Sequence, residues 1–253
     1  MRDAADLVDA EAAVDLLMRL LAVEGVTGRE KAIAGAVREA LIAAGVPADA
    51  IRFDDANGRI PLPTETGNLI ATLPGTRPGA GILFSCHLDT VPLCAGAVPR
   101  REGERIVGDG TTALGGDNRT GCAVLVTVAE TLLRHGLPHP PLTFLFTVRE
   151  ESGLHGAREL NPAELGAVAM GVNVDGQKPA DLIIGAVGQE NWEVEILGKA
   201  SHAGVAPEKG ISATMVAALG LAEARKAGWF GKVETPRGFG SSNVGIFGGK
   251  GGT

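Results

Sequence analysis

The stretch from Gly81 to Thr90 constrains the fold of this chain most, because an apolar run leads directly into two polar residues. The run GILFSC, which opens it, is typical of a buried strand. His87 and Asp89 follow two positions apart, so a strand would point both side chains the same way. A neutral imidazole in this setting binds a metal through one nitrogen while a carboxylate accepts its other N–H. The alternative is a polar strand end that only caps a sheet.

Two later apolar runs also end in acidic residues. Leu142–Val148 is followed by Glu150 and Glu151, and Ala167–Val174 is followed by Asp175. In a sheet whose strands alternate with helices, ligand sites form at the carboxyl ends of the strands. We therefore expect these acids to meet the polar pair of the first strand at one edge of an α/β sheet.

The remaining segments complete this α/β pattern. Asp117 closes a long loop, Pro92–Gly116, and stands at the start of a predicted helix. Residues 27–30, Thr-Gly-Arg-Glu, have the spacing of a capping box before another helix. Apolar spacing predicts helices over Ala4–Glu24, Thr27–Gly45 and Arg119–His135, a helical turn over Leu154–Leu160, and short strands over Ile51–Phe53 and Asn68–Leu73.

The pattern changes at about residue 185, so we expect two domains, 1–184 and 185–253. The second segment predicts a half-exposed strand over Asn191–Gly198, a helix over Ile211–Ala227 and a strand over Phe239–Gly248. Two strands and one helix make a poor independent unit, because a two-stranded sheet is only marginally stable alone. We therefore expect the second domain to be incomplete.

Composition excludes several classes of function. The chain has 253 residues and a net charge of −7, so no basic surface is expected for nucleic acid or an anionic membrane. Its three cysteines form no C-x-x-C pair, which favours a reduced, intracellular protein. No apolar run approaches the roughly 18 residues of a membrane span, and the N-terminus lacks a signal peptide. We expect a cytoplasmic protein.

The strand-end residues together favour a metal site. Five carboxylates that converge without a cation would repel one another, and nearby Arg119 and Arg149 are too few to neutralise them all. One imidazole with several carboxylate oxygens suits zinc, manganese or cobalt. A carboxylate shared between two metals is typical of two-metal hydrolases.

Five motifs carry a resemblance to a known family. The series HLDTV, GDGTTALGGDNRTG, REESG, NVDG and SHAG, in this order, resembles the co-catalytic zinc exopeptidases and deacylases. That family includes peptidase T, carboxypeptidase G, acetylornithine deacetylase and succinyl-diaminopimelate desuccinylase. The resemblance covers the chain from about residue 10 onward, and GDGTTALGGD with GQENW is similar to the peptidase T branch. It implies a three-layer α/β/α zinc-binding catalytic domain with an inserted α+β lid, or dimerisation, domain.

The resemblance also implies a role for each strand-end residue. Asp117 would bridge two zinc ions, which cobalt or manganese could replace, and the peptide bond after it is expected to be cis. His87 and Asp175 would complete one site and Glu151 the other. The implied roles are metal ligation by His87, Asp117, Glu151 and Asp175, catalysis by the general base Glu150, and support of the His87 imidazole by Asp89.

Two residues of the second segment match lid positions of the family. His202 resembles a lid histidine that, in dimeric relatives, reaches the active site of the partner subunit and stabilises the oxyanion. Asn243 resembles a lid asparagine that contacts the substrate. The resemblance therefore implies a homodimer formed through the lid domain, acting on short peptides.

Three functions remain open at this stage. The first is hydrolysis of short peptides by zinc-activated water, as in a tripeptide aminopeptidase. The second is removal of an acyl group from N-acyl amino acids at the same dinuclear site. The third is a metal-binding fragment without turnover, because the last histidine ligand of the family would lie beyond Thr253. One zinc would then keep only Asp117 and Glu151, whereas catalytic zinc usually has three protein ligands.

Overall fold

The computed structural model describes residues 4–176, 178, 180–186, 188–236 and 238–249. The chain divides into two compact units, unit 1 (Met1–Asp181) and unit 2 (Leu182–Thr253). Their assignment as catalytic and lid domains, with the boundary expected at residue 184, stays a prediction. Among the described residues, no helix combines the length and the apolar character that crossing a membrane requires.

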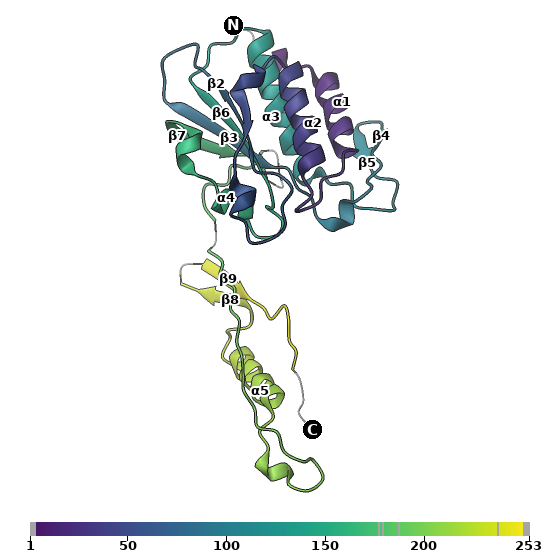
Figure 1. Cartoon of the computed structure of the whole chain (residues 1–253), viewed down its shortest axis with the longest axis vertical. Coiled ribbons are helices and arrows are strands. Elements are labelled where there is room, and N and C mark those ends of the chain that lie inside the picture. The colour runs from purple at the N-terminus through teal and green to yellow at the C-terminus, as the bar shows by residue number, and fades with distance from the viewer. Residues whose placement is uncertain (1–3, 177, 179, 187, 237, 250–253) are drawn as a thin grey trace. The chain divides into compact units, whose positions relative to one another are not determined.

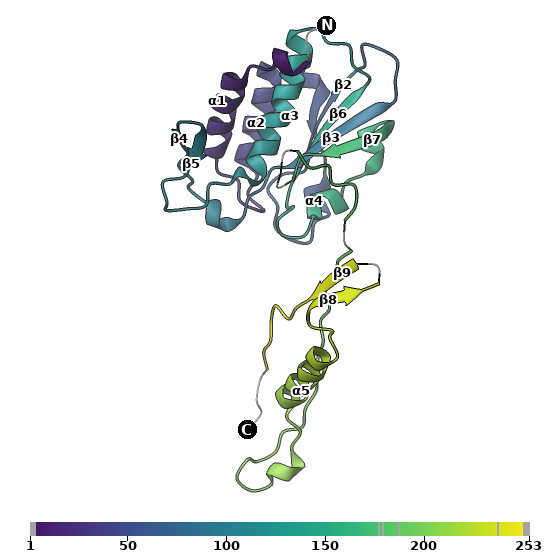
Figure 2. The same ribbon diagram turned by 180° about the vertical axis from the view of Figure 1, so that it is seen from behind.

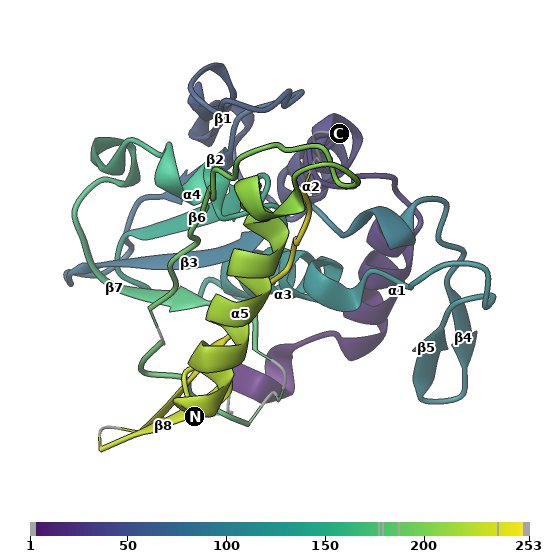
Figure 3. The ribbon, with the colours of Figure 1, turned by 90° about the horizontal axis from the view of Figure 1, so that it is seen from below.

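Unit 1 is built on a five-stranded mixed sheet with the strand order β1-β2-β6-β3-β7. Its central strand β6 runs parallel to β3, and β3 runs parallel to β7. On the other side of β6, β2 is antiparallel to β6 and also to its other neighbour, β1. Figure 3 shows β2, β6, β3 and β7 as neighbours in this order. The three strands expected to carry site residues are thus adjacent and parallel, so their carboxyl ends share one edge. The strands are β1 (Ile51–Phe53), β2 (Leu69–Leu73), β3 (Gly81–His87), β6 (Leu142–Thr147) and β7 (Val168–Asn173).

Three long helices cover one face of this sheet (Figures 1 and 2). They are α1 (Ala10–Leu21), α2 (Lys31–Ala43) and α3 (Gly116–Arg134). The core lies between them and the sheet, where Phe144 and Phe146 of β6 are fully buried. The helices pack on the sheet through apolar residues at helical spacing, because such residues recur on one side of each helix. The sequence prediction of these helices and strands in an α/β fold is confirmed.

The opposite face carries only short helical segments within the described residues. These are α4 (His155–Arg158) and the 3-10 turn η5 (Pro162–Leu165), which is fixed to β6 by a hydrogen bond from Thr143 Oγ1 to the carbonyl of Leu165 (3.0 Å). Of the three layers expected for the catalytic domain, the described residues therefore form the sheet and one layer of long helices.

The start of α2 differs from the prediction. Glu30 immediately precedes the helix but its side chain makes no capping bond, and Thr27 donates instead to Ser152 Oγ (3.0 Å). The helix is present, but the expected capping box is not formed. The Glu30 carboxylate instead accepts the backbone N–H groups of Gly28 and Arg149.

Two other predictions of local structure were incomplete. The expected loop Pro92–Gly116 contains a small hairpin of β4 (Arg100–Glu102) and β5 (Arg105–Val107). The helix expected from Arg119 begins at Gly116, with a kink at its first residues. The β4–β5 hairpin and the early start of α3 depend on local turns, which the spacing of apolar residues does not predict.

The described residues of unit 2 form one α-helix, one short 3-10 turn (Pro207–Lys209) and one antiparallel hairpin. The helix α5 (Ala213–Lys226) confirms the prediction, and β9 (Gly238–Ser242) begins the strand expected at Phe239 but ends earlier. Its partner β8 (Gly231–Thr235) was missed. The strand expected over Asn191–Gly198 is wrong, because these residues form no described strand and Trp192 is 82% exposed. An alternating pattern forms a strand only where a partner pairs with it.

Candidate metal centre

The polar strand-end residues meet at the edge that the topology predicts. His87 is the last residue of β3, and Glu150 and Glu151 lie in the turn that follows β6. Asp117 comes from the first turn of α3, and Asp175 follows β7. Because β6, β3 and β7 are parallel neighbours, the residues at their carboxyl ends lie close together in space, and the start of α3 adds Asp117 to them.

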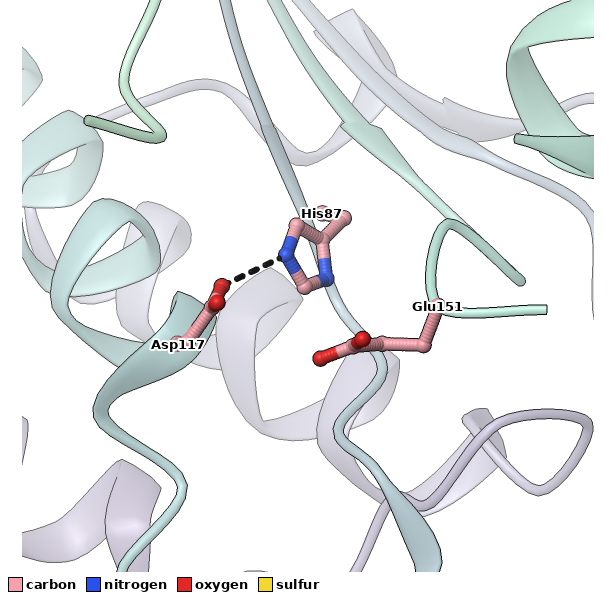
Figure 4. Close-up of side chains that lie close together, drawn as sticks. All are labelled: His87, Asp117 and Glu151. Carbon is pink, nitrogen blue, oxygen red and sulfur yellow. Dashed lines mark hydrogen bonds and ion pairs between the residues drawn. The ribbon is translucent and has the colours of Figure 1, made fainter. Parts of the chain in front are cut away.

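His87 lies at the centre of this group. Its Nε2 atom is 2.9 Å from Oδ1 of Asp117, 3.6 Å from Oδ1 of Asp175 and 3.9 Å from Oε2 of Glu150. His87, Asp117 and Glu151 each offer one ligand atom, and these atoms lie within 4.8 Å of one another (Figure 4). This spacing is small enough for one cation to contact all three residues.

The other ring nitrogen of His87 faces Asp89. Its Nδ1 atom is 2.9 Å from the backbone carbonyl oxygen of Asp89 and 3.4 Å from the carboxylate Oδ1. With Nδ1–H donating to this carbonyl, the neutral imidazole has its lone pair on Nε2, which faces the acidic cluster. The carboxylate of Asp89 also accepts the backbone N–H groups of Glu150 (2.9 Å) and Glu151 (3.1 Å). Asp89 therefore contacts the His87 imidazole and also the backbone of Glu150 and Glu151. The second contact was not predicted from the sequence.

The electrostatics of the cluster indicate a need for positive charge. Burial lowers the pKa of His87, but hydrogen bonds and charge interactions with Asp175 and Asp89 outweigh it and raise the value to about 11. Burial also raises the pKa of Glu150 and of Glu151, and neighbouring carboxylates raise both further, against the opposing effect of His87. The protein alone thus favours a proton on His87. A divalent cation would replace this proton and offset the acidic charge, so the residues present fit a metal.

The two nearby arginines are directed elsewhere. Arg119 is 2% exposed, and its guanidinium donates to the carbonyl groups of Leu88, Val23 and Gly25. Arg149 donates to the Thr64 and Ser152 hydroxyl groups and to a backbone carbonyl. In the described part of the chain, neither guanidinium therefore pairs with a carboxylate of the cluster.

Asn118 is part of the site and was not singled out from the sequence. Its Nδ2 donates to the carbonyl of Val174 (2.7 Å) and to Oδ1 of Asp175 (3.2 Å), while its Oδ1 accepts from Gly121 N (2.9 Å). Asn118 thereby connects the start of α3 to the residues that follow β7. The peptide bond between Asp117 and Asn118 is cis, as expected.

A pocket of about 220 Å³ adjoins the cluster. Glu150 lines it together with His87 and Asp175, and apolar side chains of Leu145 and Leu154 form part of its wall. The candidate base therefore faces open space rather than the packed core.

The two remaining candidate residues lie in unit 2. His202 is exposed in a turn, where its Nδ1 accepts from Gly204 N (3.1 Å). Asn243 is exposed just after β9. Their contact with substrate stays a prediction.

Comparison with known proteins agrees with this site. The sequence profile of peptidase family M28 matches residues 68–211, which include the whole strand-end cluster. A protein of Bacillus subtilis, YqjE, is 39% identical over 158 residues, covering 62% of this chain and 42% of that protein. Peptidase T of Escherichia coli is 30% identical over 193 residues, covering 63% of this chain and 46% of peptidase T.

Solved structures of similar proteins share the fold. The aminopeptidase PepT of Bacillus cereus is 34% identical and superposes with a TM-score of 0.68, covering 85% of this chain and 57% of that one. A tripeptidase of Staphylococcus aureus is 26% identical with a TM-score of 0.77, covering 98% of this chain and 63% of the tripeptidase. The chain is thus shorter than these relatives and spans less than half the length of the two curated proteins. It belongs to peptidase family M28, within the M20/M28-type co-catalytic zinc peptidases, and is peptidase T-like.

Proposed function

We propose that this protein hydrolyses peptide bonds in short peptides, in the manner of a tripeptide aminopeptidase. The observation that carries the proposal is the group of His87, Asp117 and Glu151, whose ligand atoms lie within 4.8 Å of one another beside Glu150. The similarity to a tripeptidase structure supports short peptides as the substrate class.

The proposed metal ligands are His87, Asp117, Glu151 and Asp175. Asp117 is 2.9 Å from His87 Nε2 and also belongs to the group with Glu151, so it suits a ligand shared by two ions. Zinc, or cobalt or manganese in its place, would supply Lewis acidity to a substrate carbonyl and to water. Asn118 holds Asp175 by a hydrogen bond of 3.2 Å and so restricts the direction of that carboxylate.

Glu150 is the proposed general base. Its backbone N–H is fixed by Asp89, and its carboxylate lines the pocket with Oε2 3.9 Å from His87 Nε2. Burial raises the pKa of Glu150, which makes its carboxylate a better proton acceptor near neutral pH. Glu150 would take a proton from water at Oε2 and return it to the leaving amine.

Unit 2 is the proposed dimerisation segment. Its large apolar side chains include Trp192, Leu197 and Phe239, which are 82%, 83% and 65% exposed. Exposed apolar groups of this kind favour association with another surface. We propose that two chains associate through this unit, that His202 and Asn243 contact the substrate, and that the protein is cytoplasmic.

The function is tested by comparing two substrate classes. Purified protein with added zinc is incubated with a tripeptide or with an N-acyl amino acid, and parallel samples contain a chelator. The proposal expects release of the N-terminal residue of the tripeptide, dependent on metal and lost in Glu150→Gln, with little hydrolysis of the N-acyl amino acid. Preferred hydrolysis of the N-acyl amino acid would support the deacylase alternative. Bound zinc without hydrolysis of either substrate would support the fragment without turnover.

A further inference from the structure

Glu30 is a buried carboxylate that the proposed reaction does not use. It is 0% exposed, and its Oε1 accepts two backbone N–H groups, from Gly28 (2.6 Å) and from Arg149 (3.1 Å). Its Oε2 has no hydrogen-bond partner in the described part of the chain. Glu30 precedes α2 but makes no capping bond to it, so stabilising that helix does not explain its burial. The contact with Arg149 instead joins residues 119 positions apart.

This contact belongs to a series of four consecutive backbone N–H groups, Val148 to Glu151, which we call the 148–151 turn. Each of the four donates to a buried side chain rather than to a neighbouring strand. The acceptors are Asn68 Oδ1 for Val148 (3.1 Å), Glu30 Oε1 for Arg149 (3.1 Å), Asp89 Oδ1 for Glu150 (2.9 Å) and Asp89 Oδ2 for Glu151 (3.1 Å). Three side chains from separate segments thus hold the backbone that carries the proposed base and ligand.

The turn needs such support because its backbone is unusual. Arg149 has φ = 50°, in the left-handed region that residues other than glycine rarely adopt. A residue persists there only where its surroundings hold it. Glu30 accepts the backbone N–H of Arg149, and the Arg149 side chain donates to the hydroxyl groups of Thr64 and Ser152.

Asn68 holds the beginning of the turn in a fixed position. It is 0% exposed, and its Nδ2 donates to Asp54 Oδ2 (2.7 Å) and to the carbonyl of Gly156 (2.9 Å). Gly156 N in turn donates to the carbonyl of Val148 (3.0 Å). A Cβ atom on Gly156 would lie 2.3 Å from this carbonyl oxygen and 2.4 Å from Asn68 Oδ1, so only glycine allows the approach.

We propose that Glu30 and Asn68 are positioning residues that fix the 148–151 turn and thereby direct Glu150 and Glu151 toward the metal centre. The roles of these two glutamates rest on the proposed function. The positioning itself depends on acceptor oxygens at set positions. Residues that orient metal ligands affect metal affinity.

Two substitutions at Glu30 separate the position of the acceptor from its charge. Glu30→Gln keeps an oxygen at the place of Oε1 without the charge, whereas Glu30→Asp keeps the charge but is one methylene shorter. Glu39, on the helix α2 that follows Glu30 and with a side chain 71% exposed, gives the matched controls Glu39→Gln and Glu39→Asp. Hydrogen–deuterium exchange of peptides spanning 148–151 is measured without metal, and zinc affinity is measured by competition with a chromophoric chelator.

We expect Glu30→Asp to accelerate exchange of the 148–151 turn about five- to tenfold, the effect of one lost hydrogen bond. Its zinc dissociation constant should rise about tenfold, as is typical when a residue that supports a ligand is changed. Glu30→Gln should stay near wild type in both measurements. If Glu30→Asp fails to fold, Asn68→Ser tests the turn from its other end, with faster exchange expected in the same peptides.

Exchange and zinc affinity of Glu30→Asp equal to those of Glu39→Asp would overturn the proposal, as would faster exchange with unchanged affinity. Equal loss in Glu30→Gln and Glu30→Asp would also overturn it, because an acceptor oxygen kept at the place of Oε1 would then not be enough to hold the turn. Neither measurement uses a peptide substrate. Failure of the proposed peptidase activity would therefore be seen separately, as zinc binding without hydrolysis.

Discussion

The Nε2 atom of His87 lies 2.9 Å from Oδ1 of Asp117, although the two residues are 30 positions apart and belong to a strand and a helix. The contact brings the proposed bridging carboxylate to the only ring nitrogen of His87 that faces the cluster. Removal of this carboxylate should therefore affect every metal ion bound there.

We predict that Asp117→Ala removes all bound zinc, because both proposed ions share this residue. Zinc per chain is measured by elemental analysis after dialysis against metal-free buffer. The control is Glu104→Ala, which removes an exposed carboxylate from the preceding loop. Retention of the wild-type zinc content by Asp117→Ala would show that Asp117 is not a ligand.

Asp89→Asn should destabilise the metal-free protein by about 1–3 kcal/mol, since the amide keeps only one of the two acceptors that hold Glu150 N and Glu151 N. The free energy of unfolding is measured in urea with chelator present. Asp49→Asn changes an exposed aspartate and serves as the control. A loss no larger than that of the control would mean that the two N–H groups find other partners.

The stability of the metal-free protein should depend on pH through Glu30. Burial raises the pKa of Glu30 above its ordinary value of 4.5, so the folded state holds this proton more tightly than the unfolded state. Stability from Glu30 is thus greatest at low pH and is lost as pH rises from about 4.5 through the raised pKa. In Glu30→Gln this loss is absent.

Urea unfolding of wild type and Glu30→Gln from pH 4.5 to pH 8 measures the effect. The unfolding free energy of Glu30→Gln relative to that of wild type should increase as pH rises, because only wild type loses the contribution of Glu30. Other carboxylates titrate equally in both proteins and cancel in the difference. A difference that is constant over this range would contradict the prediction.

His202 should act on the active site of a partner subunit. We predict that His202→Ala, weakly active alone, and Glu150→Gln, inactive alone, regain hydrolysis when mixed, because one hybrid site then contains both intact residues. Size-exclusion chromatography and subunit labelling establish that dimers form and exchange. If activity stays absent in dimers that exchange, His202 acts within its own chain or has no catalytic part.

The sequence predicted the parts of the site that follow local rules. His87, Glu150, Glu151 and Asp175 each stand at or just past the end of an apolar run, and the alternation of strands and helices predicted that these ends share one edge. The observed parallel pairing of β3 with β6 and β7 confirms this inference. An apolar run predicts a strand most directly where the strand is buried, as β6 is throughout its length.

Other features depend on contacts between distant segments, which no local pattern records. Glu30 has capping-box spacing, yet its carboxylate bonds to Arg149, 119 residues away. Asn68 similarly contacts Val148, 80 residues away. The wrong strand at Asn191–Gly198 has the same origin, since alternation predicts a strand but pairing requires a partner.

The adjacent residues Glu150 and Glu151 provide the most direct test of the central claim, that this strand edge is a metal centre in which one glutamate binds metal and its neighbour acts as base. The measurement is the zinc affinity of wild type, Glu150→Gln and Glu151→Gln by chelator competition at one pH. We predict wild-type affinity for Glu150→Gln and at least roughly tenfold weaker binding for Glu151→Gln, because only the latter loses a ligand. Weaker binding by Glu150→Gln with unchanged binding by Glu151→Gln would contradict the assignment, and unchanged binding in both would contradict the site.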